Sequence, residues 1–235
     1  MLTDKALREG PEERLVELKK KAREDTVLVH EIYASVQGES THAGRPCTFV
    51  RTTGCHLRCV YCDTEHAFHA GSERTVVEIV DAVRALGLPL VELTGGEPLL
   101  QKSAFALVRA LADDGREVLI ETSGGVSVEG VDPRAKLILD VKTPGSGESA
   151  RNVWRNLSLL EAGRDEVKFV ICDAADYAWS RDQLARVPAG VTVLFSPSFP
   201  GQAPAALAEW IVRDRLPVRF QLQMHKVLWG ERTGV

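Results

Sequence analysis

The sequence has no strong excess of charge of either sign. Lys and Arg together number 29 and Asp and Glu number 33, which leaves a formal net charge of −4. A protein whose main ligand is a nucleic-acid backbone normally carries a strongly basic surface. The balance therefore argues against direct binding of nucleic acid, although the scattered Lys and Arg residues leave room for a local anion site.

Long apolar runs are also missing. No stretch approaches the roughly 20 apolar residues of a membrane-spanning helix. The N-terminal segment, residues 1–26, is charged throughout and lacks the apolar stretch of a secretory signal. We therefore expect no membrane partner and a cytoplasmic location, where thiols stay reduced. The composition predicts a charged N-terminal arm at residues 1–26 and one domain at residues 27–235.

Cysteine is scarce but clustered. The chain has 5 cysteines, an odd number that argues against a disulfide framework. Cys55, Cys59 and Cys62 follow a predicted strand with the spacing CxxxCxxC, and thiolates in such a group bind either zinc or an iron–sulfur cluster. A closed zinc site would need a fourth ligand such as His66, and a closed cluster could use Cys47. A 4Fe–4S cluster held by three cysteines would instead leave one iron open to a small molecule.

From about residue 48 onward, runs rich in β-branched residues alternate with segments of helical periodicity. This alternation predicts an α/β fold with a parallel sheet. About six βα units fit the chain, too few for a full barrel, so we expect a partial, open β/α barrel. Residues 27–40 are expected to add a strand or a loop over its mouth, and Ser103 is the expected N-cap of its helix. The expected strands are 48–53, 89–96, 116–125, 135–147, 165–171, 191–199 and 218–226, and the expected helices are 75–87, 103–115, 153–162, 175–186 and 204–213.

The expected strands end in polar or glycine residues. Their tails read TGCHLRC, TGGEP, ETSGG, DVKTPGSG and SPSF. In parallel α/β folds, ligands bind outside the carboxyl ends of the strands. The tails should therefore converge on one face, and we expect the functional site there.

The cysteine motif and its surroundings resemble the radical S-adenosylmethionine (SAM) superfamily, whose CxxxCxxC loop carries an aromatic residue, here Tyr61, before the last cysteine. Further stretches narrow the resemblance: SVQGES, FVRTTGCHLRCVYCDT, TGGEPLL, ETSG, DVKTPGSG and QMHKVLWGERTGV. Together they are similar to the 7-carboxy-7-deazaguanine synthase family, and the similar region covers residues 27–235. The resemblance implies a partial barrel of the radical SAM type.

The resemblance also implies a lyase reaction. Members of this family convert 6-carboxy-5,6,7,8-tetrahydropterin into 7-carboxy-7-deazaguanine, a ring contraction that releases ammonia on the route to queuosine and other 7-deazapurines. The implied cofactors are a 4Fe–4S cluster, SAM and Mg²⁺. The implied partners are the pterin substrate, an electron donor such as flavodoxin or ferredoxin, and a second copy of the chain in a homodimer.

Matching positions imply roles for individual residues in cofactor binding. Cys55, Cys59 and Cys62 would hold the cluster, and Thr64 would contact Mg²⁺, which prefers hard oxygen ligands such as a hydroxyl. Glu97 would either contact SAM or have a structural role. The expected SAM contacts are Tyr61, Cys62, Asp63, Gly96, Ser123, Asp140, Val141, Lys142 and Ser196.

The resemblance further implies a pterin pocket. An amide side chain suits the donor–acceptor edge of a pterin, and a guanidinium fork suits its carboxylate. For Arg51 the alternative is an ordinary salt bridge at a strand end, while His225 and Lys226 could complete the pocket. The expected substrate contacts are Val36, Gln37, Gly38, Arg51, Thr94 and Val235.

Two other functions remain open for the cysteine motif. One is a radical SAM activase that makes a glycyl radical on a partner protein. The other is a zinc-binding module without catalytic activity.

Overall fold

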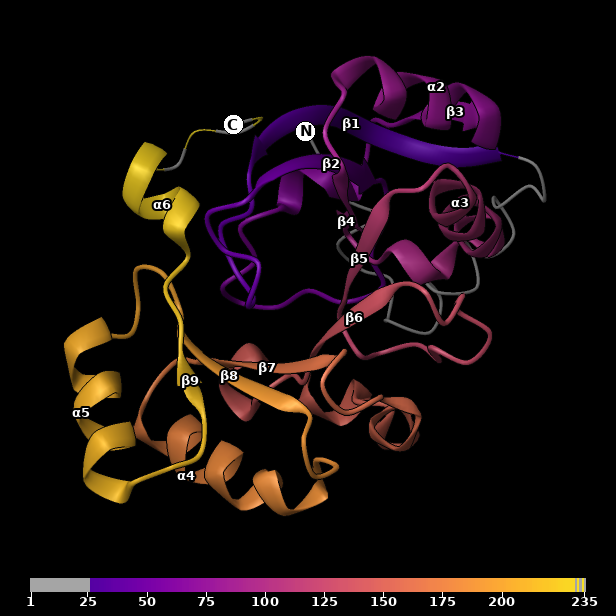
Figure 1. Ribbon diagram of the computed structural model, residues 1–235. Helices are drawn as coiled ribbons and strands as arrows, with labels where there is room; N and C mark the ends of the chain where they lie inside the picture. Colours follow the sequence, from indigo (N-terminus) through magenta and orange to yellow (C-terminus); the bar gives the residue numbers. More distant parts are fainter. Residues whose placement is uncertain (1–25, 231, 233, 235) are drawn as a thin grey trace.

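The chain folds around a single large sheet (Figure 1). The computed structural model describes residues 26–230, 232 and 234, so the predicted arm, apart from Thr26, lies outside the described residues, as does Val235. The sheet has nine strands in the order β3-β1-β2-β4-β5-β6-β7-β8-β9. The strands are β1 Thr26–Val36, β2 Pro46–Thr52, β3 Ser72–Thr75, β4 Leu90–Gly95, β5 Glu117–Thr122, β6 Lys136–Asp140, β7 Glu166–Ile171, β8 Thr192–Pro197 and β9 Arg219–Phe220.

Most of the sheet is parallel. Each neighbouring pair from β2 and β4 through to β9 runs parallel, whereas β1 pairs antiparallel with both β2 and β3 at one edge. Residues 27–40 were expected to form a strand or a loop over the mouth, and residues up to Val36 form the strand β1. Within the described residues the edge strands β3 and β9 do not pair with each other, so the sheet curves without closing. The predicted open partial barrel is therefore confirmed.

Helices cover the outer face of the curved sheet (Figure 1). In α2, Thr75 and Glu78 form a capping box at the start, and Gly87 ends the helix in the left-handed conformation that glycine adopts without strain. The helices are α2 Val76–Leu86, α3 Lys102–Asp113, α4 Ala174–Gln183, α5 Pro204–Asp214 and α6 Met224–Trp229, and a 3-10 helix, η5, spans Trp154–Leu159.

Strand alternation divides the side chains into two populations. In β4, Val91 and Leu93 point outward into the main core, where they pack with helix residues such as Ile79 and Leu107. At the amino end of β4 the inward side chain is apolar, and Leu90 packs there with four other buried residues, Cys47, Phe49, Leu119 and Ile138. Above this apolar layer the inward positions turn polar, and the barrel interior becomes a charged cavity.

Three local predictions were wrong. The helix expected to begin at Ser103 begins at Lys102 with Gln101 as N-cap, because the Ser103 hydroxyl bonds the Thr26 carbonyl instead. The helix expected at residues 153–162 is the shorter 3-10 helix η5, where the amide of Asn156 bonds the backbone of the 124–128 loop. The last strand, expected at residues 218–226, ends at Phe220, and α6 follows it.

No helix in the described part of the chain combines the length and apolar character needed to cross a bilayer.

Candidate active site

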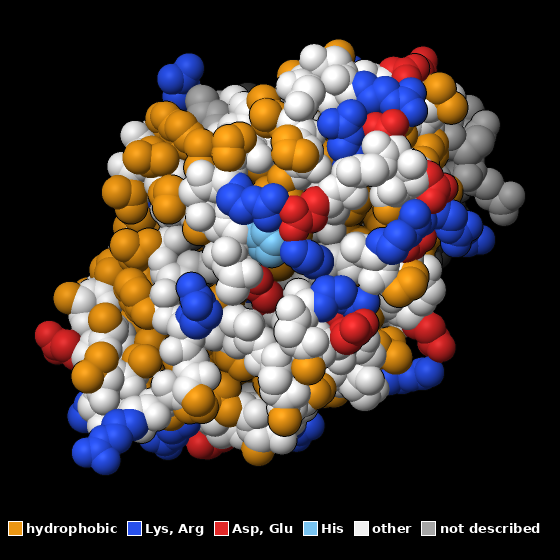
Figure 2. All heavy atoms as spheres, in the orientation of Figure 1, with side chains coloured by type: hydrophobic (Ala, Val, Ile, Leu, Met, Phe, Trp, Pro, Cys, Tyr) orange, Lys and Arg blue, Asp and Glu red, His pale blue; other side chains and the backbone are white. Residues whose placement is uncertain are grey.

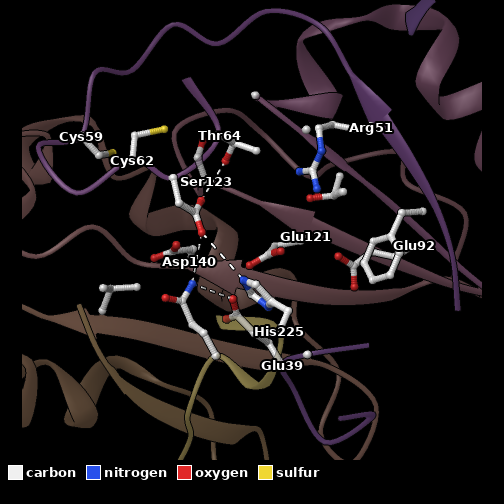
Figure 3. Close-up of a pocket in the computed structure, with 18 of the residues that line it drawn as sticks. Glu39, Arg51, Cys59, Cys62, Thr64, Glu92, Glu121, Ser123, Asp140 and His225 are labelled. Atoms are coloured by element: carbon white, nitrogen blue, oxygen red, sulfur yellow. Dashed lines mark hydrogen bonds and ion pairs between the residues drawn. The ribbon is translucent and has the colours of Figure 1, made fainter. Parts of the chain in front are cut away.

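One large pocket opens at the carboxyl ends of the parallel strands and reaches into the barrel interior. Figure 3 shows Cys59 and Cys62 at one end of this pocket and Arg51 and Glu92 at the other. In Figure 2, Lys, Arg, acidic and His side chains gather near the middle of one face, while apolar side chains spread over the side formed by α5 and α6. The predicted site residues that line the pocket are Val36, Gln37, Gly38, Arg51, Cys55, Cys59, Tyr61, Cys62, Asp63, Thr64, Thr94, Gly96, Ser123, Asp140 and Lys142.

Two predicted SAM contacts, Val141 and Ser196, are not among the residues that line the pocket. Val141 belongs to the main apolar core, and Ser196 is buried within β8. Where the SPSF tail reaches the pocket, it does so through Ser198 and Phe199. The convergence of the strand tails on one face is thus observed, while contacts from Val141 and Ser196 to SAM stay predictions.

The cysteine loop that follows β2 is anchored by its own apolar residues. Cys55, Leu57 and Phe68 form a small buried cluster, and Cys59 and Cys62 pack against it. Burial raises the pKa of all three thiols, that of Cys55 to about 12. Thiols in this setting stay protonated until a metal centre supplies the positive charge that stabilises a thiolate.

The donor set fits a cluster held by three cysteines. Cys47 lies in the separate apolar layer at the closed end of the barrel, and Cys172 does not line the pocket, so the described residues bring no fourth thiol to it. Nor do three His, Cys, Asp or Glu side chains anywhere in the described chain lie close enough to hold one ion. The thiols share a pocket without meeting at a point, which suits the separate corners of a 4Fe–4S cluster better than a closed zinc site.

Two glycines at the end of β4 pack directly against the base of the cysteine loop. A Cβ on Gly96 would lie 2.2 Å from the backbone oxygen of Gly54, and one on Gly95 would lie 2.4 Å from that of Thr52. Gly95 also has a φ of 137°, which residues with side chains rarely adopt. The GG pair therefore fixes the cysteine loop onto the sheet and brings the thiols to the mouth of the barrel.

Two roles were predicted for Glu97, contact with SAM or a structural role, and its hydrogen bonds show a structural one. Its carboxylate is fully buried and accepts hydrogen bonds from the backbone N–H of Leu99 at 3.0 Å, the backbone N–H of Ser123 at 2.7 Å and the hydroxyl of Thr122 at 2.9 Å. The Ser123 hydroxyl donates to it as well. Glu97 therefore joins the carboxyl ends of β4 and β5, and it does not line the pocket.

A buried ammonium group organises the centre of the pocket. The Nζ of Lys168 lies 2.9 Å from a Glu39 carboxylate oxygen and 3.9 Å from one of Asp140, and it forms an ion pair with Glu121. Burial lowers the pKa of a lysine, but the carboxylates of Glu121 and Glu39 outweigh burial and raise the pKa of Lys168 well above its usual value. The lysine is therefore a permanent cation that holds β5, β6 and the 37–45 loop together.

Asp140 and Tyr61 offer unused polar atoms to a ligand. The Nζ of Lys142 binds one Asp140 oxygen at 2.8 Å and lies 5.8 Å from the centre of the Tyr61 ring. Within the described chain, the other Asp140 oxygen, Oδ1, and the Tyr61 hydroxyl are buried without a hydrogen-bond partner. Buried polar atoms are normally paired, so these two atoms mark a place where a bound molecule would supply the partners.

Arg51 forms a salt bridge with Glu31, as in the alternative to substrate binding that the sequence left open. It also lines the pocket. Its Nε donates to Glu31 at 2.8 Å and its Nη2 donates to the Tyr33 hydroxyl at 2.8 Å. Neither contact uses Nη1. The salt bridge therefore orients the guanidinium group without using all of its donors.

The C-terminal helix α6 closes the pocket beside the cysteine loop. Asp63 lies 3.5 Å from the Nζ of Lys226 and 3.9 Å from the Nε2 of His225, and the Thr64 hydroxyl donates to it at 3.0 Å. Desolvation alone would raise the pKa of Asp63, but the contacts with His225 and Lys226 hold it well below its usual range. Asp63 is therefore a carboxylate, and Thr64 stands next to a fixed negative charge.

Gly38 lets α6 approach the pocket floor. A Cβ on Gly38 would lie 2.4 Å from the Nδ1 of His225, and the backbone N–H of Met224 donates to the Gly38 carbonyl at 2.9 Å. His225 and Lys226 were predicted to complete the pocket, and both line it.

Sequence reasoning missed several polar residues of the pocket. Most lie inside strands, where alternation alone could have placed them on the inward face. Glu39 lies in the SVQGES stretch, but the sequence predicted no role for it. The missed residues are Glu31, Tyr33, Glu39, Glu92, Glu121 and Lys168.

Known proteins resemble this chain over most of its length. Residues 49–145 match the model of the radical SAM superfamily. A protein named 7-carboxy-7-deazaguanine synthase from Chlorobaculum tepidum is 46% identical over 206 residues, which cover 86% of this chain and 94% of that protein. Proteins of the same name from Koribacter versatilis and Thermoplasma acidophilum are 41% and 36% identical and are covered over 98% and 100% of their lengths, by 87% and 89% of this chain.

Among solved structures, QueE from Escherichia coli has the same fold. It superposes with a TM-score of 0.72 at 19% identity, and the match covers 90% of this chain and 98% of that one.

The role of Glu97 predicts a large loss of stability on its removal. Glu97→Ala should lower the free energy of unfolding by about 3 kcal/mol, because several buried donors lose their acceptor. Denaturant unfolding under anaerobic conditions measures it. Glu78→Ala, which removes the exposed carboxylate of the α2 capping box, is the control and should cost only about 1 kcal/mol or less. Equal losses for the two variants would contradict the proposed role of Glu97.

Proposed function

The chain belongs to the 7-carboxy-7-deazaguanine synthase family of radical SAM enzymes, and on that premise we propose that it converts 6-carboxy-5,6,7,8-tetrahydropterin into 7-carboxy-7-deazaguanine with release of ammonia. The observation that carries this proposal is a single cavity with three thiols at its rim and a charged, strand-lined interior below them. The product places the enzyme in the biosynthesis of queuosine and related 7-deazapurines. The relatives give no support to a glycyl-radical activase or to a zinc-binding module.

Cys55, Cys59 and Cys62 would hold the 4Fe–4S cluster. When bound and reduced, the cluster would supply the electron for reductive cleavage of SAM, while the protein would orient the reactants and exclude water. The unpaired buried atoms of Asp140 and Tyr61 support a polar ligand beside the thiols. For SAM we propose contacts from these two residues, from Lys142 and Ser123, and from the predicted positions Cys62, Asp63, Gly96, Val141 and Ser196.

The pterin would lie deeper in the barrel. Arg51 is held at the pocket wall by Glu31 and Tyr33, and a guanidinium group in this position can bind the substrate carboxylate. Gln37 and Gly38 would contact the ring edge, and Val36, Thr94 and Val235 would complete the contacts. The charged groups around Lys168 keep the cavity polar, as a ligand rich in hydrogen-bonding groups requires.

Thr64 would contact Mg²⁺ at the boundary between the two ligands. Its hydroxyl is a hard oxygen donor, and the adjacent Asp63 carboxylate supplies negative charge. A cation at this place would bring together the pocket wall and an anionic substrate.

The remaining partners follow from the reaction class. Reduction of the cluster requires a one-electron donor, for which flavodoxin or ferredoxin is suitable. We further propose that the enzyme acts in the cytoplasm, where thiols remain reduced, and that it works as a homodimer.

Removal of one thiol should abolish the cluster. After anaerobic reconstitution, the unmodified chain should hold about four irons and four sulfides, whereas Cys59→Ala should lose this content together with SAM cleavage. Cys172→Ala is the control, because this thiol does not line the pocket, and it should retain the iron. A colourless unmodified protein with about one zinc per chain would contradict the proposal.

Substitution of Arg51 should separate substrate binding from cluster binding. Arg51→Gln should keep its iron but weaken substrate binding by about tenfold to a hundredfold, because charge-assisted hydrogen bonds to the carboxylate are lost. The dissociation constant of the carboxytetrahydropterin measures this effect. Arg45→Gln removes another glutamate-paired arginine, outside the pocket lining, and should bind normally. Unchanged substrate affinity in Arg51→Gln would remove Arg51 from the pterin site.

The role of Thr64 is tested by titration of activity with Mg²⁺. Thr64→Ala should blunt the response to Mg²⁺, because one oxygen ligand is lost. Thr64→Ser keeps the hydroxyl and should preserve the response. An unaltered Mg²⁺ dependence in Thr64→Ala would refute this assignment.

A further inference from the structure

Glu92 is a buried acid with no cation bound to it. It lies in the middle of β4, lines the pocket, and is only 2% exposed. Within the described chain its carboxyl group makes no ion pair, and its hydrogen bond comes from the side-chain amide of Gln37. Burial and the nearby carboxylates of Glu121 and Glu39 raise the pKa of Glu92 well above its usual value, and the cations Lys168 and Arg51 offset this increase only in part.

A polar group at this position needs a reason other than stability. The inward neighbour Leu90 belongs to the apolar layer, and an aliphatic residue at position 92 would extend that layer along β4. Replacing a buried polar group with an apolar side chain of similar volume is often neutral or stabilising. The contact with Gln37 is therefore the feature of Glu92 that calls for an explanation.

The amide of Gln37 is held at both of its atoms. Its Oε1 accepts a hydrogen bond from the backbone N–H of Glu39 at 2.8 Å, and its Nε2 donates to an oxygen of Glu92. A backbone N–H can only donate, so the amide oxygen must face Glu39 and the amide nitrogen must face Glu92. Turning the side chain over would place a donor against a donor at Glu39 and the amide oxygen against the accepting oxygen of Glu92, so both contacts favour the observed direction.

The Gln37 amide still has one donor and one acceptor available to a ligand, and their order is fixed. An amide nitrogen carries two hydrogens and an amide oxygen has two lone pairs, so Gln37 retains one donor and one acceptor after both contacts. Gln37 lines the pocket and is only 3% exposed. Its free donor and acceptor match a ring carbonyl next to a ring N–H, the cyclic amide edge found in a pterin. A ring with an amino group in place of that carbonyl presents the opposite order.

We propose that Glu92 is a specificity-determining positioning residue, which fixes the direction of the Gln37 amide so that the pocket selects the 4-oxo edge of a pterin over the reversed edge of a 2,4-diaminopteridine. The inference rests on the proposed function, because it takes Gln37 as a contact to the pterin ring. Discrimination arises because the reversed edge leaves buried donors facing each other, and unpaired buried groups are costly. Glu92 acts on the ligand through Gln37.

Two oxidised ligands test this directly. 6-Carboxypterin and 2,4-diaminopteridine-6-carboxylic acid share the ring and the carboxylate and differ at the recognised edge, and neither carries a hydrogen at C6 that could be abstracted. Their dissociation constants are measured anaerobically on the reconstituted enzyme with SAM, from the change in pteridine fluorescence. The unmodified enzyme should prefer 6-carboxypterin by about tenfold or more. Glu92→Leu should reduce this preference to about threefold or less, because one of the two contacts that fix the amide is lost.

Two variants separate orientation from general damage. Glu92→Gln can still accept a hydrogen bond from Gln37 through its own amide oxygen, so it should retain the preference. Glu166→Gln alters another buried carboxylate, one that binds Thr41 in the same 37–45 loop but does not line the pocket, and it should also retain the preference. If Glu92→Leu does not fold, Glu92→Thr replaces it, because its side chain is two bonds shorter and suits a strand.

The outcomes distinguish this inference from the proposed function. A preference that persists unchanged in the folded Glu92→Leu or Glu92→Thr variant overturns the inference alone, as does an unmodified enzyme that binds both ligands equally. Loss of the preference in Glu166→Gln also counts against it, because loop anchoring would then explain the effect. An unmodified, cluster-loaded enzyme that binds neither ligand overturns the pterin assignment itself.

Discussion

A buried lysine surrounded by carboxylates is the constraint on which the interior of this open barrel depends. An isolated charge in such a place would be strongly unfavourable, so Lys168 and its partners have to be assembled together. Glu39 comes from the loop after β1, Glu121 from the end of β5 and Asp140 from the end of β6. Lys168 therefore holds together three segments that are distant in sequence. Its charge also prevents the cavity from collapsing into an apolar core.

The pocket that results has two chemically different ends. The thiol end is built from a loop, which is held by its own apolar cluster and by the packing of Gly96 against Gly54. The other end is built from strands, whose rigid backbone holds groups such as Arg51 and Glu92 at fixed positions. Soft ligands for a metal cluster and directional groups for an organic ring are thus kept apart within one cavity. This separation would allow two different ligands to lie next to each other without competing for the same side chains.

Much of the fold and the loop half of the site could be predicted from the sequence, because both are encoded locally. The thiol spacing, the glycine pair and the polar strand tails stand in short contiguous stretches, and most strands and helices follow from periodicity. The strand half could not be predicted in the same way. Gln37 and Glu92 are 55 positions apart, and their contact exists only because β1, β2 and β4 pair in one register. The errors at Ser103 and at residues 221–226 have the same origin, since a tertiary partner, Thr26 or Gly38, outweighed the local preference.

The absence of a side chain at Gly38 connects the end of the chain to the floor of the cavity. His225 occupies the space that a Cβ would fill, and α6 is tied to the same residue through its backbone. Displacement of α6 would therefore change the shape of the ligand-binding surface. Thermodynamic reciprocity then applies: whatever gain in affinity a ligand draws from the docked helix, the same ligand returns as added stability of the docking. A ligand that gains affinity from docked α6 would therefore also increase the protection of α6 from hydrogen exchange.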